Sequence, residues 1–492
     1  MWLFSSRKNG RSHSPARRPK PRLCLEILED RTLPSVSFGS ALGIGGDQSP
    51  SGGWGRDIAT DTAGNVYTTG LFDGTVDFDP AHPNTDGVLQ SKNNAQNGYV
   101  AKYAADGTFQ WARRMGGDGS SGPGGMGEAL AVDGSGNVYV VGGFSSNADF
   151  GTFTATSGDV FVTKLDATGN FQWVQTYTDH PYNDSLQDVA VDSSGNVYVT
   201  RSTNPSGASL NPNIFVVVTK LDPGTGATVW SDQFGNTGSS NINTGRGIKA
   251  DAAGNVFVTG TFTGSVDFNP GSGTFTLTSP KVKGRYAQEG FVLELTTGNS
   301  FGWAKEIAAL PNDIALDGSD NVYTTGASGN SWQLGSGGPL NVTKLSGSGT
   351  LLWSKNFANG AQNASGAAAF GVAVDGSGNV YITGYFTGTA NFNPNGTFNL
   401  TSAGDRDIFV SELDTNGNFL WAGAMGGSGV DQAASIAVDG SGNIYTTGLY
   451  GGYVTGVSNY TADFDPGTGV YDLTPLSTTD REIFLSKLIQ TT

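Results

Sequence analysis

The stretch Asp375–Gly384, with the sequence DGSGNVYITG, is one of seven similar segments in this chain of 492 residues. Consecutive segments start between 58 and 72 residues apart. A unit of this size cannot bury its own apolar face, so the repetition predicts units that pack on one another. The other six segments are DTAGNVYTTG (Asp61–Gly70), DGSGNVYVVG (Asp133–Gly142), DSSGNVYVTR (Asp192–Arg201), DAAGNVFVTG (Asp251–Gly260), DGSDNVYTTG (Asp317–Gly326) and DGSGNIYTTG (Asp439–Gly448).

Each segment predicts a β-hairpin. Apolar and polar residues alternate before the turn, as in 371–375, and again after it, as in 379–383. This period of two, with β-branched and aromatic residues, is typical of strands. The Asp-x-x-Gly-Asn sequence between them suits a turn, because Asp accepts bonds from nearby backbone amides and Gly adopts positive φ without strain.

A second signature after each hairpin supplies two more strands. Two alternating runs flank an Asp/Gly turn, and the second run contains a tryptophan. Each repeat therefore holds four strands, and seven such repeats predict an all-β, single seven-bladed β-propeller with four-stranded antiparallel blades. The signatures are YVAKYAADGTFQW (Tyr99–Trp111), FVTKLDATGNFQW (Phe161–Trp173), VVTKLDPGTGATVW (Val217–Trp230), FVLELTTGNSFGW (Phe291–Trp303), NVTKLSGSGTLLW (Asn341–Trp353) and FVSELDTNGNFLW (Phe409–Trp421).

The two ends of the chain predict how the ring closes. The last repeat reaches Phe484–Leu488 and has no tryptophan strand, whereas a spare alternating strand, about 36–44, precedes the first hairpin. We expect this N-terminal strand to complete the last blade, which removes open sheet edges. Either Phe38 or Ser40 takes the tryptophan position. The propeller then spans residues 36–492.

The paired motifs GNVYVTG and FVTKLD-x-x-G-x-x-x-W resemble the bacterial SBBP beta-propeller repeats. The resemblance covers Val36 to Leu488, almost the whole chain. It implies a seven-bladed propeller, usually in a secreted or surface protein, and it does not imply a catalytic site.

Residues 1–35 predict a disordered basic tail. Pro15, Pro19 and Pro21 lie among arginines, and the first 31 residues carry a net charge of +5. Within the tail, Arg22–Ser35 resembles a Leu-Glu-x-Leu-Glu-x-Arg motif of secreted and surface proteins in some bacteria. That resemblance implies an export element and a secreted or cell-envelope location. A short amphipathic helix is the alternative interpretation.

The remaining chain is acidic, because the whole protein has a formal charge of −16. Such a surface repels phosphate backbones and anionic lipids, so we expect no nucleic-acid partner and no membrane-surface binding. No apolar run approaches 18 residues, which predicts no transmembrane segment. The single cysteine, Cys24, allows no intrachain disulfide. We expect a monomeric propeller with a protein or carbohydrate ligand of unknown identity.

A phrase of the form apolar-Asp-Phe-Asp-Pro follows several hairpins and could place two oxygens on one face. Hard oxygen ligands suit Ca²⁺, which gives a weak candidate cation site. The alternative is a strand that ends in a turn whose Asp or Asn side chains bond their own backbone. The candidate residues are Asp77, Asp79, Asp267, Asn269, Asp463 and Asp465.

Two cations interrupt otherwise uniform columns of the repeat. Lys249 replaces the alanine found at this position of the predicted innermost strand in the other six copies, and Arg201 replaces the glycine that ends the hairpin. They are weak candidates for binding an acidic ligand. The alternative is neutral drift with side chains that reach solvent.

Sequence motifs for catalysis are scarce. Only three histidines occur, and no nucleophile elbow, HExxH, CxxC or Walker motif is present. The sequence predicts a non-catalytic, extracytoplasmic binding or structural module at the cell surface, with no cofactor. A calcium-stabilised surface adhesin is one alternative. The other is a propeller enzyme, either carbohydrate-active, with paired carboxylates, or quinoprotein-like, since Leu165–Trp173 resembles the repeat of quinoprotein dehydrogenases.

Overall fold

A computed structural model describes residues 35–46, 52–82, 86–119, 124–144, 147–156, 160–177, 185–204, 214–236, 242–328, 339–358, 366–452, 454, 460–476 and 481–491. The chain divides into two units, 1–33 and 34–492, and the description concerns the second. The predicted export motif lies outside the described residues except for Ser35. No helix in the described ranges is long and apolar enough to cross a membrane.

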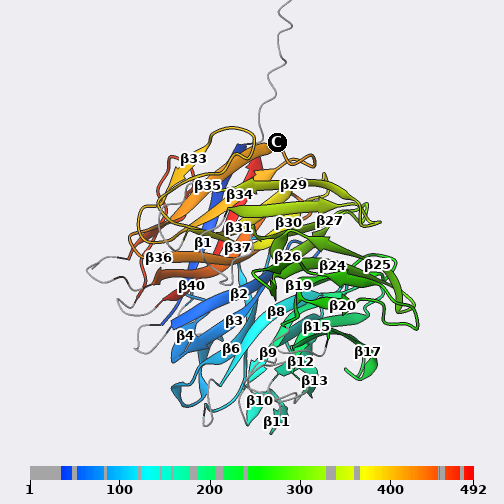
Figure 1. Cartoon of the computed structure of the whole chain (residues 1–492). Coiled ribbons are helices and arrows are strands. Elements are labelled where there is room, and N and C mark those ends of the chain that lie inside the picture. Colours follow the sequence, from blue (N-terminus) through cyan, green and yellow to red (C-terminus); the bar gives the residue numbers. More distant parts are fainter. Residues whose placement is uncertain are drawn as a thin grey trace, which may run out of the picture. The chain divides into compact units, whose positions relative to one another are not determined.

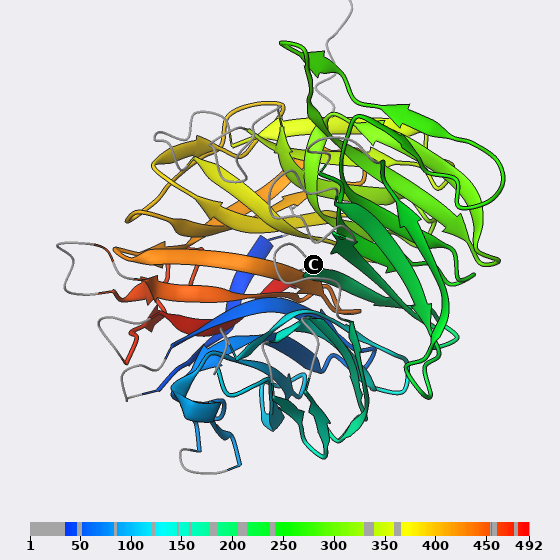
Figure 2. The ribbon, with the colours of Figure 1, turned by 60° about the horizontal axis from the view of Figure 1, so that its bottom comes forward.

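Residues 34–492 form seven four-stranded antiparallel sheets around an axis, so the predicted propeller is confirmed (Figures 1 and 2). We number the sheets as blades I to VII. Their strands, from the axis outward, are β2 (Gly52–Thr60), β3 (Val66–Asp73), β6 (Asn97–Tyr103) and β7 (Phe109–Met115) in blade I; β8 (Gly125–Val132), β9 (Val138–Phe144), β12 (Val160–Leu165) and β13 (Phe171–Tyr177) in II; β14 (Ser185–Val191), β15 (Val197–Thr203), β16 (Phe215–Leu221) and β17 (Thr228–Phe234) in III; β18 (Thr244–Ala250), β19 (Val256–Thr263), β24 (Gln288–Thr296) and β25 (Ser300–Ile307) in IV; β26 (Ala309–Leu316), β27 (Val322–Ser328), β28 (Leu340–Leu345) and β29 (Leu351–Phe357) in V; β30 (Ala367–Val374), β31 (Val380–Phe386), β34 (Asp407–Leu413) and β35 (Phe419–Gly427) in VI; and β36 (Val430–Val438), β37 (Ile444–Gly452), β40 (Glu482–Thr491) and β1 (Ser35–Ile44) in VII.

Short hairpins extend the connections between the second and third strands of several blades. They contain the phrase apolar-Asp-Phe, and the phenylalanine of each phrase is buried. The short elements are β4 (Thr75–Asp77), β5 (Val88–Gln90), β10 (Ala148–Phe150), β11 (Phe153–Ala155), β20 (Ser265–Asp267), β21 (Thr276–Thr278), β22 (Lys281–Val282), β23 (Arg285–Tyr286), β32 (Thr389–Asn391), β33 (Asn399–Thr401), β38 (Ala462–Asp463), β39 (Asp472–Leu473) and the 3-10 helix Lys92–Asn94.

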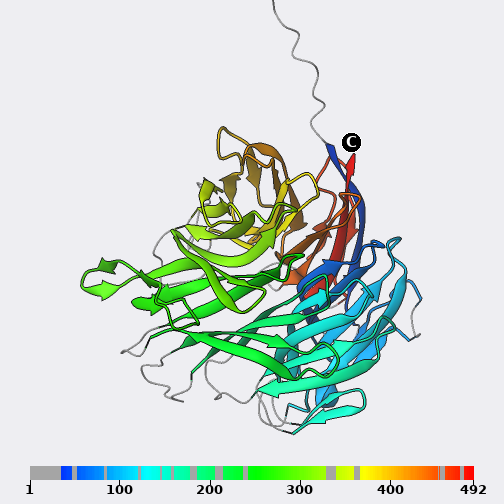
Figure 3. The ribbon, with the colours of Figure 1, turned by 90° about the vertical axis from the view of Figure 1, so that its right-hand side faces the viewer.

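The ring closes as the sequence predicts, with the first and last strands side by side (Figure 3). β1 pairs antiparallel with β40 from Ser35 opposite Thr491 to Ile44 opposite Ile483. Ser40 lies opposite Lys487, as Trp111 lies opposite Lys102 in blade I. Ser40 rather than Phe38 therefore occupies the tryptophan position.

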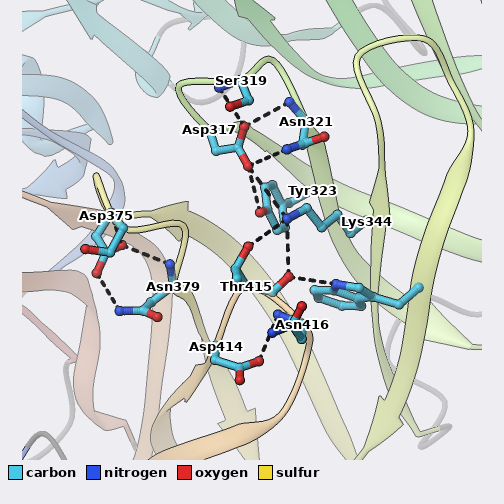
Figure 4. A network of polar contacts seen from close by, with 12 residues as sticks. Asp317, Ser319, Asn321, Tyr323, Lys344, Asp375, Asn379, Asp414, Thr415 and Asn416 are labelled. Carbon is cyan, nitrogen blue, oxygen red and sulfur yellow. Dashed lines mark hydrogen bonds and ion pairs between the residues drawn. The ribbon is translucent and has the colours of Figure 1, made fainter.

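The Asp-x-x-Gly-Asn turn is held by its aspartate, as Asp317 of blade V illustrates (Figure 4). Its Oδ1 accepts the backbone N–H groups of Ser319 and Asn321 at 2.9 and 3.0 Å. Its Oδ2 accepts bonds from Asn321 Nδ2 and the Tyr323 hydroxyl at 2.8 and 2.9 Å. The fourth turn residue needs positive φ; it is Asp320 here, at φ 58°, where the other copies have glycine. One carboxylate thus ties the turn to the strand that follows it.

Tryptophans of the outer strands connect neighbouring blades. Trp353 Nε1 of blade V donates to the backbone oxygen of Thr415 in blade VI at 3.0 Å, and Lys344 Nζ donates to the same oxygen at 3.2 Å (Figure 4). The same arrangement joins Trp111 to Ala167 and Trp173 to Pro223. Blades I, II and V are therefore each bonded to a turn of the next blade.

Removing β1 tests whether ring closure stabilises the propeller. A chain that starts at Gly45 loses the buried side chains of Ala41 and Ile44 and the partner of β40, whereas a chain that starts at Pro34 keeps them. Each large apolar side chain lost from the core costs about 1.5–3 kcal/mol. We expect the shorter chain to melt several degrees below the longer one in calorimetry. Equal melting temperatures would contradict this role of β1.

Candidate functional site

The first strands of all seven blades surround a pocket on the propeller axis. The pocket has a volume of about 470 Å³. The alanine column of the repeat lines it, as expected for small side chains where blades converge, with Lys249 at the same position in blade IV. Its lining also contains residues from outside that column, and these supply most of the charged and polar groups of the pocket.

A β-bulge in every first strand turns one extra residue into this pocket. In β2, Gly55 pairs with Gly70 and Asp57 with Thr69, so Arg56 has no partner in the ladder. Opposite the bulge, a Cβ at Gly70 would clash with the Trp54 carbonyl oxygen. Bulges commonly redirect a side chain in this way. The seven bulge residues, all in the pocket lining, are Arg56, Glu128, Gln187, Arg246, Asn312, Phe370 and Ala434.

The position after the bulge carries aspartate in blades I, III and V. Asp57 accepts the N–H of Ile58 in its own strand and that of Leu130 in blade II, both at 2.8 Å. Asp188 joins blade III to Ile248 of blade IV, and Asp313 joins blade V to Val372 of blade VI. Ser435 of blade VII donates to Asp57 Oδ1 at 2.7 Å, which links blade VII to blade I. We call these four side chains the axial bridge.

Lys249 lies among the aspartates of the axial bridge. Its Nζ is 3.3 Å from Asp188 Oδ2. Burial acts to lower the pKa of Lys249, but the charges of Asp188, Asp313 and Asp57 outweigh it and raise that pKa. Its ammonium group therefore stays protonated and compensates the carboxylates around it.

Two pocket carboxyl groups next to this cation are hard to ionise. Burial raises the pKa of Asp313 to about 7, although the positive charge of Lys249 opposes the shift. Burial, followed by repulsion from Asp188, also raises the pKa of Asp57. At neutral pH the pocket is consequently less negative than its count of acidic residues suggests.

Arg56 and Arg246 are the cations of the bulge positions. The Arg56 guanidinium lies 3.7 Å from the centre of the Trp54 ring, and its Nε is 3.9 Å from Glu128 Oε2. Arg246 forms no ion pair with any carboxylate of the described residues, and burial alone lowers its pKa. The Nε atoms of both arginines are buried and meet no hydrogen-bond acceptor in the described part of the chain.

The candidate calcium residues lie in satisfied turns, away from the axial pocket. Asp267 Oδ1 accepts N–H groups of Asn269 and Phe275 at 3.0 and 2.8 Å, and Asp463 makes the equivalent bonds to Asp465 and Tyr471. Asp77 accepts the N–H of Asp79 at 2.9 Å. In the described ranges no three His, Cys, Asp or Glu side chains form a group that could hold a metal. Calcium binding by these loops stays a prediction.

The two candidate cations lie in different places. Lys249 lines the axial pocket, whereas Arg201 on β15 lies over the Tyr177 ring, 4.9 Å from its centre, and is absent from the pocket lining. Comparison of repeat columns found Lys249 but missed Arg56 and Arg246. Their column is also variable and polar, but a bulge interrupts the alternation from which strand faces are predicted.

The SBBP beta-propeller repeat family matches residues 424–449, which together with the seven blades confirms the predicted repeat type. An uncharacterized WD repeat-containing protein of Acanthamoeba polyphaga mimivirus is 24% identical over 470 residues, covering 80% of this chain. The match covers 29% of that relative, so the chain spans under a third of its length.

Solved structures resemble the chain only distantly. A protein of unknown function from Dyadobacter fermentans has 8% identity and a TM-score of 0.43, with 93% of this chain and 100% of that chain covered. The calcium-binding protein regucalcin from Agrobacterium tumefaciens has 14% identity and a TM-score of 0.31, with 65% and 81% covered. Similarity at this level carries no statement about the function of this chain.

Replacing Lys249 tests its role in the axial bridge. In Lys249→Met the aspartates lose their compensating cation, and we expect the free energy of unfolding at pH 8 to fall by roughly 1–3 kcal/mol. Because Asp313 is protonated below about pH 7, the loss should shrink at pH 5. Lys305→Met, at an exposed lysine of β25, is the matched control. Denaturant titrations at both pH values measure the effect, and a loss that does not depend on pH would contradict this role.

Proposed function

We propose that this chain is a non-catalytic binding module that takes a small ligand into its axial pocket. The observation that carries the proposal is the set of seven bulges, each of which places a side chain at the pocket instead of in the sheet ladder. Within this set the side chains differ in charge, size and polarity, as expected of a pocket that binds a specific ligand. In contrast, the turns, tryptophans and aromatic core positions repeat almost unchanged from blade to blade.

The proposal includes action outside the cytoplasm, at the cell surface or in secreted form. Its support is the acidic composition of the chain and the resemblance of Arg22–Ser35 to an export motif. Fractionation of expressing bacterial cells, with and without residues 1–34, tests this part separately from ligand binding.

Filling the pocket tests the binding proposal. Ala131 faces the pocket, so Ala131→Phe narrows it, whereas Ala63→Phe places the same side chain on an exposed turn. We expect at least one compound of a library of sugars, sugar acids and other small metabolites to raise the melting temperature of the parent and of Ala63→Phe. That increase should be absent in Ala131→Phe. Stabilisation that survives in Ala131→Phe would refute the axial site.

A carbohydrate-active enzyme is the second candidate function, because aspartate carboxyl groups of three blades converge on the pocket. Glycoside hydrolysis uses one protonated and one ionised carboxyl group, and the pKa of Asp313, about 7, allows it to be protonated at neutral pH. Against this candidate, each of these carboxylates already accepts two backbone N–H groups.

Chromogenic aryl glycosides test the enzymatic candidate. If it holds, the parent hydrolyses at least one of them, and Asp313→Asn lowers the rate by about 100-fold or more, as expected for loss of a general acid. Asp472→Asn, at an exposed position of β39, should retain the activity. If the parent protein hydrolyses none of these substrates, the enzymatic candidate is rejected and the binding-module proposal stands.

A further inference from the structure

The axial pocket contains a cationic side chain, Arg246, whose buried Nε meets no hydrogen-bond acceptor among the described residues. Arg246 belongs to β18 and is the bulge residue of blade IV, between Gly245 and Gly247. Its Nε is buried without an acceptor, and its guanidinium is not within ion-pair distance of any described carboxylate. A buried donor without a partner costs about 1–3 kcal/mol, more when it is charged. In a native protein such a group calls for an explanation.

The other cations of the pocket differ from Arg246 in their partners. Lys249 is held by Asp188 at 3.3 Å, and Arg56 stacks on Trp54 and lies near Glu128. The two flanking glycines leave Arg246 without neighbouring side chains in its own strand, and no packing role for it is evident. The Nε of Arg56 is also buried without a hydrogen-bond acceptor in the described residues, with Glu128 Oε2 3.9 Å away.

The order of the blades places these two arginines across the axis. Blades I and IV are separated by two blades on one side of the ring and by three on the other. A ligand in the pocket would therefore meet a guanidinium at both ends. Guanidinium groups bind carboxylate and phosphate oxygens in a forked geometry, with charge-assisted hydrogen bonds.

We propose that the axial pocket binds a small molecule bearing a carboxylate or phosphate group, whose oxygens accept bonds from Arg246 on one side and Arg56 on the other. This inference rests on the proposed function and specifies its ligand. The pocket volume of about 470 Å³ suits a molecule of mono- to disaccharide size.

Calorimetric titration of the full chain with matched probes tests this assignment. Glucuronate and glucose differ by one carboxylate, and inorganic phosphate provides the second oxyanion. We expect glucuronate, phosphate or both to bind, and glucose to bind at least 10-fold more weakly. Binding of glucuronate alone assigns the site to carboxylates, and binding of phosphate alone assigns it to phosphates.

Variants at Arg246 separate ligand binding from folding. Arg246→Gln should weaken oxyanion binding by about 10- to 100-fold, and Arg246→Lys, which keeps the charge but not the fork, by less. Without ligand, Arg246→Gln should melt no lower than the parent, because it removes an unpaired guanidinium. Lys305→Gln, outside the pocket, is the control.

Two results would overturn the inference. One is the absence of phosphate and glucuronate binding up to about 10 mM. The other is equal binding of glucose and glucuronate that Arg246→Gln leaves unchanged. Neither result decides whether the pocket binds some other compound, because the comparison of Ala131→Phe with Ala63→Phe answers that question independently.

Discussion

The axial bridge is the constraint on which the rest of the propeller depends. Where seven sheets converge, each first strand is the inner edge of its sheet, and an edge strand has backbone N–H groups that no further strand accepts. Asp57, Asp188 and Asp313 accept these groups from two blades at a time. An odd ring cannot be paired completely in this way. Blade VII is the one left over, and there a serine hydroxyl, which donates to Asp57, replaces a fourth carboxylate.

The carboxylates at the axis repel one another, and the cations of the pocket reduce this repulsion. Three aspartates in a narrow space repel one another and resist ionisation, as the raised pKa values of Asp57 and Asp313 indicate. Lys249 supplies the opposing charge at the one blade where the alanine column is interrupted. Lys249 therefore has a structural role that accounts for its departure from the repeat. Arg246, three residues earlier in the same strand, differs, because its buried Nε meets no acceptor among the described residues.

Most of the fold could be predicted because its determinants are local and repeated. Asp317 and its six counterparts specify a turn within five residues, and the tryptophans mark the outer strands. The register of β1 could not be decided between Phe38 and Ser40, because the shift at Gly39 in its pairing with β40 leaves no trace in the alternation. The pocket was missed for the same reason. Arg56 and Arg246 are bulge residues. Side chains of a strand alternate between the two faces of its sheet, and at a bulge this alternation resumes only with the next residue, so it does not predict where the bulge residue points.

The pairing of β1 with β40 also determines when the molecule can be completed. Ser37 and Ile489 are in contact although they lie 452 positions apart. At ordinary rates of synthesis, roughly 20 to 90 s pass between the emergence of these two strands from the ribosome. During that time blades I to VI can form, but the seventh sheet lacks its third strand, β40, and β1 therefore has no strand to pair with. The ring therefore stays open until β40 has been synthesised, however early β1 emerges.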